Sequence, residues 1–239
     1  MQVDLNADLG ESYGRWQLGD DESMLEVITS ANLACGFHAG DPATLRRICR
    51  AAVSRGVRIG AQVGYPDLVG FGRRFIDVEP EELTADVIYQ LGALDGTARS
   101  VGGRVSYLKP HGALYHAVTD RTDQATAVVE AVLAFDESLP VLGFPGSELL
   151  RVAAERGLRT VTEYFIDRGY TAAGRLVDRR SPDAIITDPV VAAERAVAAA
   201  RRGVADSFCT HGDTPDSVRM AIAVRAALAD AGVELRPFC

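Results

Sequence analysis

The stretch QVDLNADLGES, residues 2–12, decides the fold, because it has the pattern of a short strand that ends in a cluster of polar groups. Over residues 2–7 apolar and polar side chains alternate, as they do in a strand with two different faces. Asp4, Asn6 and Asp8 share one face, and Val3 and Leu5 share the other. In a closed barrel the polar face would point into the mouth of the barrel and the apolar face onto surrounding helices.

The rest of the chain repeats this alternation of strand and helix. Predicted strands cover residues 2–7, 31–35, 57–63, 105–109, 141–143, 160–164 and 206–210. Predicted helices cover residues 21–28, 42–55, 80–101, 122–135, 147–156, 188–202 and 215–231. Pro42, Pro80 and Pro215 fall at or near the first helical turn, where proline is tolerated. We therefore expect one α/β domain over residues 1–239, with parallel strands and right-handed crossovers.

Polar clusters follow the predicted strands directly. They occupy residues 6–11, 35–41, 62–67, 109–112, 144–146, 163–168 and 211–213. An open sheet concentrates its ligand contacts near one switch point, whereas a barrel carries function around the whole carboxyl rim of its strands. The pattern favours a single-domain, seven-unit β/α barrel with the active site at its C-terminal rim.

Composition and charge exclude several classes of protein. The net charge of −8 repels phosphate backbones, so nucleic acid is a poor candidate partner. No stretch has the length of apolar residues that a membrane helix needs, and the first residues lack a basic region followed by an apolar run, so we expect a cytoplasmic protein. The cysteines, which we expect to be reduced, form no CxxC pair. They are Cys35, Cys49, Cys209 and Cys239.

Lys109 is the one lysine among 25 basic residues. A position that keeps an ammonium where the chain otherwise uses arginine is one that needs a compact point charge. Lys109 follows a predicted strand and precedes Pro110 and His111, so it could stabilise an oxyanion or a phosphorylated intermediate, with His111 as general acid or base. The alternative is a buried pair with a carboxylate that braces the barrel.

Three of the four histidines, His38, His111 and His211, lie in the rim segments. The first and third are each followed by an aspartate, Asp41 or Asp213, and imidazole beside carboxylate suits proton transfer, metal ligation or anion binding. The alternative is that each aspartate only caps the next helix. The fourth histidine, His116, is interpreted as structural or exposed.

Asn6, Asp8 and Glu11 gather oxygens after the first strand. Such a group could bind a divalent metal, act as acid and base, or hold a substrate N–H, and the alternative is a loop organised by Asx turns. No two histidines have a compact metal-ligand spacing, so the sequence does not decide whether a metal is bound. The sequence has no P-loop, no GxGxxG turn and no GxSxG elbow, so ATP, if used, is not held by a recognisable motif.

Several segments together resemble the LamB/YcsF family, in order from about residue 2 to residue 216. They are VDLNADLGES (3–12), SANLACGFHAGDP (30–42), IGAQVGYPDLVGFGRR (59–74), YLKPHGALYHA (107–117), EYFIDRGY (163–170), GRLVDRR (174–180) and CTHGDTP (209–215). The resemblance implies a barrel related to those of glycoside hydrolases and deacetylases. It also implies ATP-coupled opening of the lactam ring of 5-oxo-L-proline to L-glutamate, with ADP and phosphate formed, in a complex with 5-oxoprolinase subunits B and C.

The resemblance also implies a set of rim residues. They are Asn6, Asp8, Glu11, His38, Asp41, Lys109, His111, Asp167, Arg168, His211 and Asp213. We expect catalysis from Asp8, His38, Lys109, His111 and His211. We expect substrate binding from Asn6, Glu11, Asp41, Arg73, Arg74, Glu163, Asp167, Arg168 and Asp213. One departure stands out: many similar sequences read GAHPGYPD where this chain has Gln62 and Val63, and an amide replaces the hydrogen bonding of a histidine but not its basicity.

The implied chemistry fits these residue types. An unstrained lactam is a poor electrophile, so phosphorylation by ATP as co-substrate, bound here or on a partner protein, would activate its carbonyl group. Lys109 and Arg168 would then serve a phosphoryl group or oxyanion, and Arg73 or Arg74 the substrate carboxylate. Two alternatives are open: a stand-alone, metal-dependent deacetylase or amidohydrolase with Asp8, His38 and His211 as ligands, and a non-catalytic subunit that binds the lactam or holds its partners.

Overall fold

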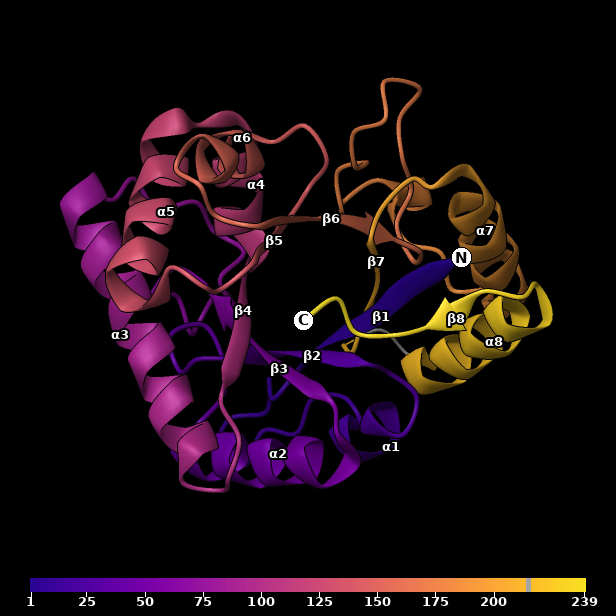
Figure 1. The fold of residues 1–239 in the computed structure, drawn as a ribbon, viewed down its shortest axis with the longest axis horizontal. Helices are drawn as coiled ribbons and strands as arrows, with labels where there is room; N and C mark the ends of the chain where they lie inside the picture. Colours follow the sequence, from indigo (N-terminus) through magenta and orange to yellow (C-terminus); the bar gives the residue numbers. More distant parts are fainter. Residues whose placement is uncertain (214–215) are drawn as a thin grey trace.

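The computed structural model describes residues 1–213 and 216–239, and over them seven parallel strands close into a barrel (Figure 1). The strands are β1 (Gln2–Leu9), β2 (Ser30–Ala34), β3 (Arg58–Val63), β4 (Val105–Pro110), β5 (Val141–Gly143), β6 (Thr160–Phe165) and β7 (Ser207–His211). They pair in sequence order, and β1 closes the ring because it pairs with β2 on one side and β7 on the other. The predicted seven-unit barrel is therefore confirmed.

Helices surround this ring on the outside (Figure 1). They are α1 (Asp21–Leu25), α2 (Pro42–Arg55), α3 (Pro80–Arg99), α4 (Gly112–Asp120), α5 (Thr122–Asp136), α6 (Glu148–Glu155), α7 (Pro189–Arg202) and α8 (Ser217–Asp230), with a 3-10 turn at Pro182–Ala184. Pro42 and Pro80 begin helices as predicted, whereas the predicted helical start at Pro215 lies outside the described residues. Helix α4 was not predicted. In the described part of the chain no helix is long and apolar enough to cross a membrane.

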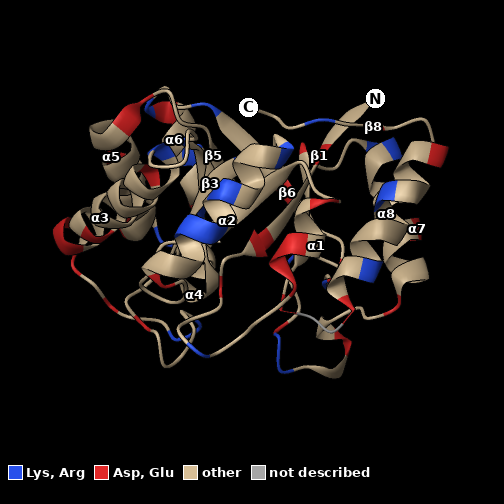
Figure 2. Cartoon of the chain, turned by 90° about the horizontal axis from the view of Figure 1, so that it is seen from below, with Lys and Arg blue, Asp and Glu red and all other residues tan. Residues whose placement is uncertain are grey.

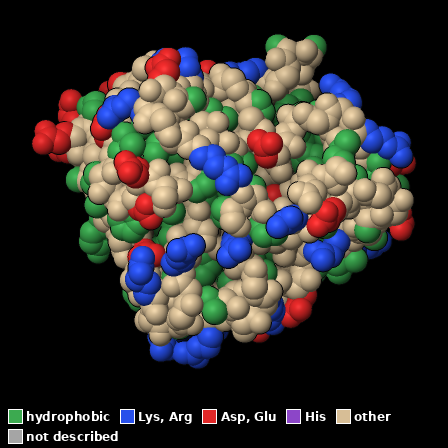
Figure 3. Space-filling model, in the orientation of Figure 1, with side chains coloured by type: hydrophobic (Ala, Val, Ile, Leu, Met, Phe, Trp, Pro, Cys, Tyr) green, Lys and Arg blue, Asp and Glu red, His purple; other side chains and the backbone are tan. Residues whose placement is uncertain are grey.

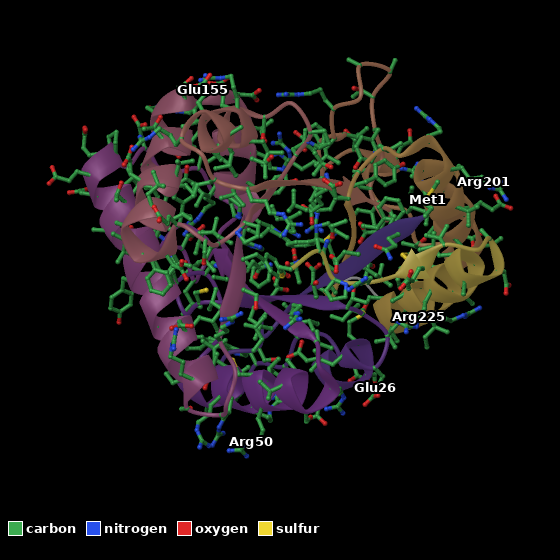
Figure 4. All side chains as sticks on the ribbon, viewed as in Figure 1. Met1, Glu26, Arg50, Glu155, Arg201 and Arg225 are labelled. Carbon is green, nitrogen blue, oxygen red and sulfur yellow. The ribbon has the colours of Figure 1, made fainter. Side chains whose placement is uncertain are left out.

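The outward faces of the strands pack on the helices through apolar side chains such as Leu5, Ile48 and Leu91, all buried. Figure 4 shows the labelled charged side chains Glu26 and Arg50 at the outer edge of the molecule. The four cysteines are free thiols, as predicted. Burial of the apolar faces is the main force that closes the barrel.

The two ends of the barrel differ. In Figure 2 both termini lie at one end, and the long loops that follow the strands lie at the other. At the terminal end a short strand, β8 (Glu234–Leu235), pairs with the start of β1, and Phe238 then packs against Tyr107, Leu142 and Val161 inside the ring. No histidine is visible on this face in Figure 3. The C-terminal segment therefore closes the end of the barrel at which the termini lie, and the carboxyl rim is the open end.

Polar side chains fill the interior of the barrel between its middle and the carboxyl rim. Asp4 accepts hydrogen bonds from hydroxyls of Thr29, Ser30 and Ser207. Closer to the carboxyl rim, the side-chain amide of Asn32 donates to Asn6 at 2.7 Å and to Asp8 at 2.8 Å. These residues confirm that the polar face of β1 points inward. Their satisfied hydrogen bonds make the floor of the rim rigid.

Candidate active site

A cavity of about 900 Å³ opens at the carboxyl rim, as the position of the polar clusters predicted. Five residues at or just after the strand ends line it: Asp8, Lys109, His111, Phe165 and His211. Five arginines from the loops also line it: Arg73, Arg121, Arg168, Arg179 and Arg180. The aspartates Asp120 and Asp178 also lie on its wall, but the arginines outnumber the acidic side chains that line the cavity. Such a cavity suits a small anionic ligand.

Lys109 lies at the floor of the cavity, between two carboxylates. Its Nζ lies 2.8 Å from Oδ1 of Asp8 and 2.8 Å from Oε1 of Glu163, and 3.2 Å from Sγ of Cys209. Burial alone would lower the pKa of Lys109, but the charges of its neighbours, Asp8 first, raise it well above its usual range. Lys109 therefore carries its positive charge at physiological pH. It forms the buried pairs with carboxylates that would brace the barrel, and it also lies at the floor of the cavity, where it could contact a substrate.

His211 at the end of β7 is oriented by Asp167. Its Nδ1 lies 2.9 and 3.0 Å from the two carboxylate oxygens of Asp167, and its backbone N–H donates to the same carboxylate at 2.8 Å. Because a carboxylate only accepts, Nδ1 carries the proton and Nε2 is free to act as a base in the neutral ring. Burial raises the pKa of Asp167, but His211 and its hydrogen bonds outweigh this and leave the pKa below its usual value.

The structure gives His211 a different partner from its sequence neighbour Asp213. Asp213 instead forms ion pairs with Arg73 at 2.5 Å and Arg179 at 3.6 Å. We expected Asp167 to bind substrate, and it is found supporting the histidine. The signal that could have indicated it is its place after β6, which neighbours β7 in any ring with sequential strand order.

A second histidine group lies after β2 and β4. The rings of His38 and His111 stack with centroids 4.0 Å apart and planes 9° apart. Gln62 at the end of β3 links His38 to Glu11, since its amide lies 3.1 Å from Nε2 of His38 and 3.2 Å from Oε1 of Glu11. Within the described residues, Glu11, His38 and His111 have ligand atoms that all lie within 4.8 Å of one another. Asp8 and His211, suggested with His38 as metal ligands, are not in this group.

Burial controls the charge of this second group. It lowers the pKa of His38 to about 4, and burial and the stacked His38 lower the pKa of His111 well below its usual range, so both rings are neutral at physiological pH. Burial and the nearby Asp8 and Asp213 raise the pKa of Glu11. Neutral imidazole is the form that ligates metals.

Other predicted residues have local structural contacts. Asp41 caps α2, accepting from the backbone N–H groups of Ala43 at 3.0 Å and Thr44 at 3.2 Å, as the capping alternative expects. Arg74 pairs with Asp67, whereas its neighbour Arg73 lines the cavity.

Arg168 and Asn6 also bind within the protein. Arg168 is buried and donates to the carbonyl groups of Ala184 and Val177, so it holds the loop after β6 in place. Asn6 lies in the interior below the cavity, where it donates to Ser207 at 2.7 Å. His116 is exposed at the cavity wall, which agrees with its interpretation as a structural or exposed residue. Gln62 is the site residue that sequence reasoning did not assign a role.

Comparison with known proteins agrees with the fold. A crystal structure of the lactam utilization protein from Thermus thermophilus covers all of both chains with a TM-score of 0.95 and 44% identity. A family 4 carbohydrate esterase from Streptomyces lividans, 12% identical with a TM-score of 0.55, shares the fold alone. The expected β/α-barrel fold is thus confirmed.

The sequence comparisons identify the family. The chain is 56% identical over 248 residues to the A subunit of 5-oxoprolinase from Streptomyces avermitilis, and 55% identical over 249 residues to that from Mycobacterium marinum, covering 99% of each chain in both cases. The profile of the LamB/YcsF family matches residues 3–239. The chain belongs to the LamB/YcsF family.

Proposed function

We propose that this chain is a hydrolase that opens the lactam ring of 5-oxo-L-proline, as the A subunit of an ATP-dependent 5-oxoprolinase. The names of its relatives, which are 5-oxoprolinase A subunits and a lactam utilization protein, support the substrate class and a complex of several subunits. The B and C subunits are the partners we propose. The observation that carries the proposal is the arginine-lined cavity above Lys109 and the Asp167–His211 pair.

The cavity suits a substrate more anionic than 5-oxoproline itself. The lactam carries one carboxylate, and phosphorylation of its carbonyl oxygen would add a second anionic group. Arg73 and Arg179 lie on the same wall through their shared partner Asp213, and guanidinium groups bind both carboxylate and phosphate. We propose that ATP phosphorylates the lactam at a partner protein, since this chain has no P-loop, and that the phosphorylated lactam is opened here.

The residues at the cavity floor supply the groups that ring opening needs. Nε2 of His211 takes a proton from water, whose oxygen adds to the activated carbonyl carbon. The ring C–N bond then breaks, its electron pair goes to nitrogen, and the nitrogen takes up a proton, which gives the acyl phosphate at the γ-carboxyl group of glutamate. A second water hydrolyses this acyl phosphate to L-glutamate and phosphate. The original carbonyl oxygen keeps the phosphoryl group throughout, and Lys109 stabilises the negative charge on the water-derived oxygen as the C–N bond breaks and that oxygen becomes the carbonyl group of the acyl phosphate.

The test is reconstitution from separately purified subunits. This chain alone, B with C, and the three together would be incubated with 5-oxoproline and ATP, with glutamate and ADP measured separately. We expect glutamate in quantity only when this chain is present with B and C. Glutamate formed equally well by B and C without this chain would show that this chain is a scaffold and would refute the proposal.

The Glu11, His38 and His111 group favours a second candidate, a metal-dependent amide hydrolase that needs no ATP. The same experiment separates the two. Glutamate released by this chain with a divalent metal ion, in the absence of ATP and partners, would support the second candidate.

A further inference from the structure

We propose that Arg73 and Arg179, backed by the buried charge of Arg168, form a subsite for a phosphoryl dianion on the cavity wall beside His211. The three arginines come from the loops after β3 and β6, and all three line the cavity. The inference rests on the proposed function in one respect, because that function supplies a phosphorylated lactam as the ligand. The same subsite holds the phosphate that hydrolysis releases.

Asp213 holds the two direct ligands of the subsite on one side. Nη2 of Arg73 donates to Oδ2 of Asp213 at 2.5 Å, and Nη1 of Arg179 lies 3.6 Å from the same oxygen. The longer distance is beyond a hydrogen bond, so Arg179 meets Asp213 through charge alone. Each guanidinium has five N–H donors, so two of them that share one carboxylate oxygen have donors left for a ligand.

Arg179 is the guanidinium that lacks acceptors. Its Nε is buried and has no hydrogen-bond partner within the described chain, and 25% of its side chain is exposed. Arg168 shows the opposite case, because its Nε donates to the carbonyl group of Ala184 at 3.1 Å and its Nη2 to that of Val177 at 2.8 Å. A buried N–H group without an acceptor costs free energy. The oxygens of a phosphoryl group would supply acceptors to Arg179.

The charges around the subsite select a dianion. Its three guanidinium groups share one carboxylate, Asp213, so two positive charges are left in excess. The acidic residues elsewhere on the cavity wall have cations of their own: they are Asp8 with Lys109, Asp120 with Arg175, and Asp178 with Arg180. A phosphate monoester carries about −1.5 to −2 charges at pH 7, whereas a carboxylate carries one. The excess charge therefore matches a phosphoryl group better than a carboxylate.

The pKa directions agree with this crowding of positive charge. Burial and the nearby Arg179 lower the pKa of Arg168. Burial alone would raise the pKa of Asp213, but Arg73, His211 and Arg179 hold it below its usual value. Asp213 is therefore ionised, and it lies close enough to His211 to interact with its charge. An anion bound by these arginines relieves their mutual repulsion and lies next to the proposed base.

The first experiment titrates the full chain with inorganic phosphate by calorimetry, with acetate and 5-oxoproline as carboxylate comparisons at the same ionic strength. We expect one phosphate per chain, bound about 10-fold or more tightly than either carboxylate, as an added charge-assisted hydrogen bond allows. The ¹⁵Nε NMR signal of Arg179 should shift as phosphate binds. Equal affinity for phosphate and acetate, or no saturable binding of phosphate, would overturn the inference.

Variants locate the subsite. Arg179→Met should weaken phosphate binding about 10- to 100-fold, because it removes a charge-assisted hydrogen bond. Arg179→Lys keeps the charge but not the planar fork, so it should weaken binding less. Arg175→Met is the matched control, because Arg175 lies in the same loop, already pairs with Asp120 and does not line the cavity. It should bind phosphate as the wild type does, and equal affinities of Arg179→Met and wild type would contradict the subsite.

Reconstitution separates this inference from the proposed function. Phosphate bound at Arg179 in a chain that forms no glutamate with B and C would refute the proposed function and leave the subsite standing. Glutamate formed by a complex whose A subunit binds no phosphate at Arg179 would overturn the subsite and leave the proposed function standing.

Discussion

Two histidine groups share the rim of this barrel, and they differ in how each histidine meets its carboxylate. On the β6–β7 side, Nδ1 of His211 is bonded to Asp167 at 2.9 Å. On the β1–β4 side, Nδ1 of His111 is 3.9 Å from Glu11, and Nδ1 of His38 has no partner in the described chain.

This difference separates two kinds of chemistry built from the same residue types. A carboxylate bonded to one imidazole nitrogen fixes the tautomer and leaves the other nitrogen to move a proton. Two buried, stacked imidazoles whose Nε2 atoms meet oxygen acceptors are held neutral and in a fixed orientation, which suits hydrogen bonding rather than proton transfer. Lys109 lies below, bound to Asp8 and Glu163.

The largest effect is expected from a variant that disables only the proton-transfer group at His211. His211→Asn removes the base but keeps a polar side chain, so we expect glutamate formation by the reconstituted complex to fall about 10²- to 10⁴-fold. A rate within a factor of three of the wild type would show that His211 is not the base.

Removal of the shared cation tests how the barrel is held together. Lys109→Met leaves Asp8 and Glu163 buried without a counter-ion, and we expect the free energy of unfolding to fall by about 3–5 kcal/mol. The control is Arg151→Met, which breaks exposed pairs with Glu148 and Glu155 and should leave the urea midpoint close to that of the wild type. Urea denaturation of both variants makes the comparison, and equal losses would contradict it.

The polar floor below both groups should show in the pH dependence of stability. Burial raises the pKa of Asp4 to about 6 from 3.8, although hydroxyls of Ser207, Ser30 and Thr29 oppose the shift. The folded state thus favours the protonated form, whose stabilisation is complete below about pH 4 and is lost as the pH rises through about 6, by at most about 3 kcal/mol.

Asp4→Asn should therefore flatten the change in stability between about pH 4 and pH 7 relative to the wild type. Asp21, whose pKa burial also raises to about 6, is present in both proteins and cancels in the difference. Parallel pH profiles of the unfolding free energy would show that Asp4 titrates normally.

The smallest expected effect concerns binding. Arg179 lines the cavity beside Asp213. Arg179→Ala should raise KM for 5-oxoproline in the complex about 10-fold, near 1.4 kcal/mol, with little change in kcat. A fall in kcat at constant KM would instead assign Arg179 to the chemical step.

Much of the fold could be predicted because it follows from local patterns. Short apolar runs that alternate with stretches of helical periodicity predicted all seven strands of the ring within a few residues. Helix α4 was missed because His111, which precedes it, and Gly112, its first residue, have the composition of a loop, and Gly112 indeed has a positive φ of 56°.

Pairing within the site could not be predicted to the same extent. Glu163 on β6 meets Lys109 on β4 across the interior of the barrel, so this contact follows from the curvature of the ring, whereas Asp167 meets His211 between the neighbouring strands β6 and β7. Sequence adjacency pointed to Asp213 for His211, but the turn after β7 directs Asp213 to Arg73. The role of Gln62 depends on His38 and Glu11, which come from two other parts of the chain, so no local signal could indicate it.

The central claim is that the ring is opened at Lys109 in this chain, and Lys109→Arg tests it most directly. Arginine keeps the charge but is planar and longer, and a displacement of about 1 Å can cost about 100-fold in rate. Glutamate formation should be measured in the complex with B and C, with the unfolding curve of the variant as control. A folded variant whose glutamate formation falls about 100-fold or more is the predicted result, and turnover near the wild-type rate would contradict the account.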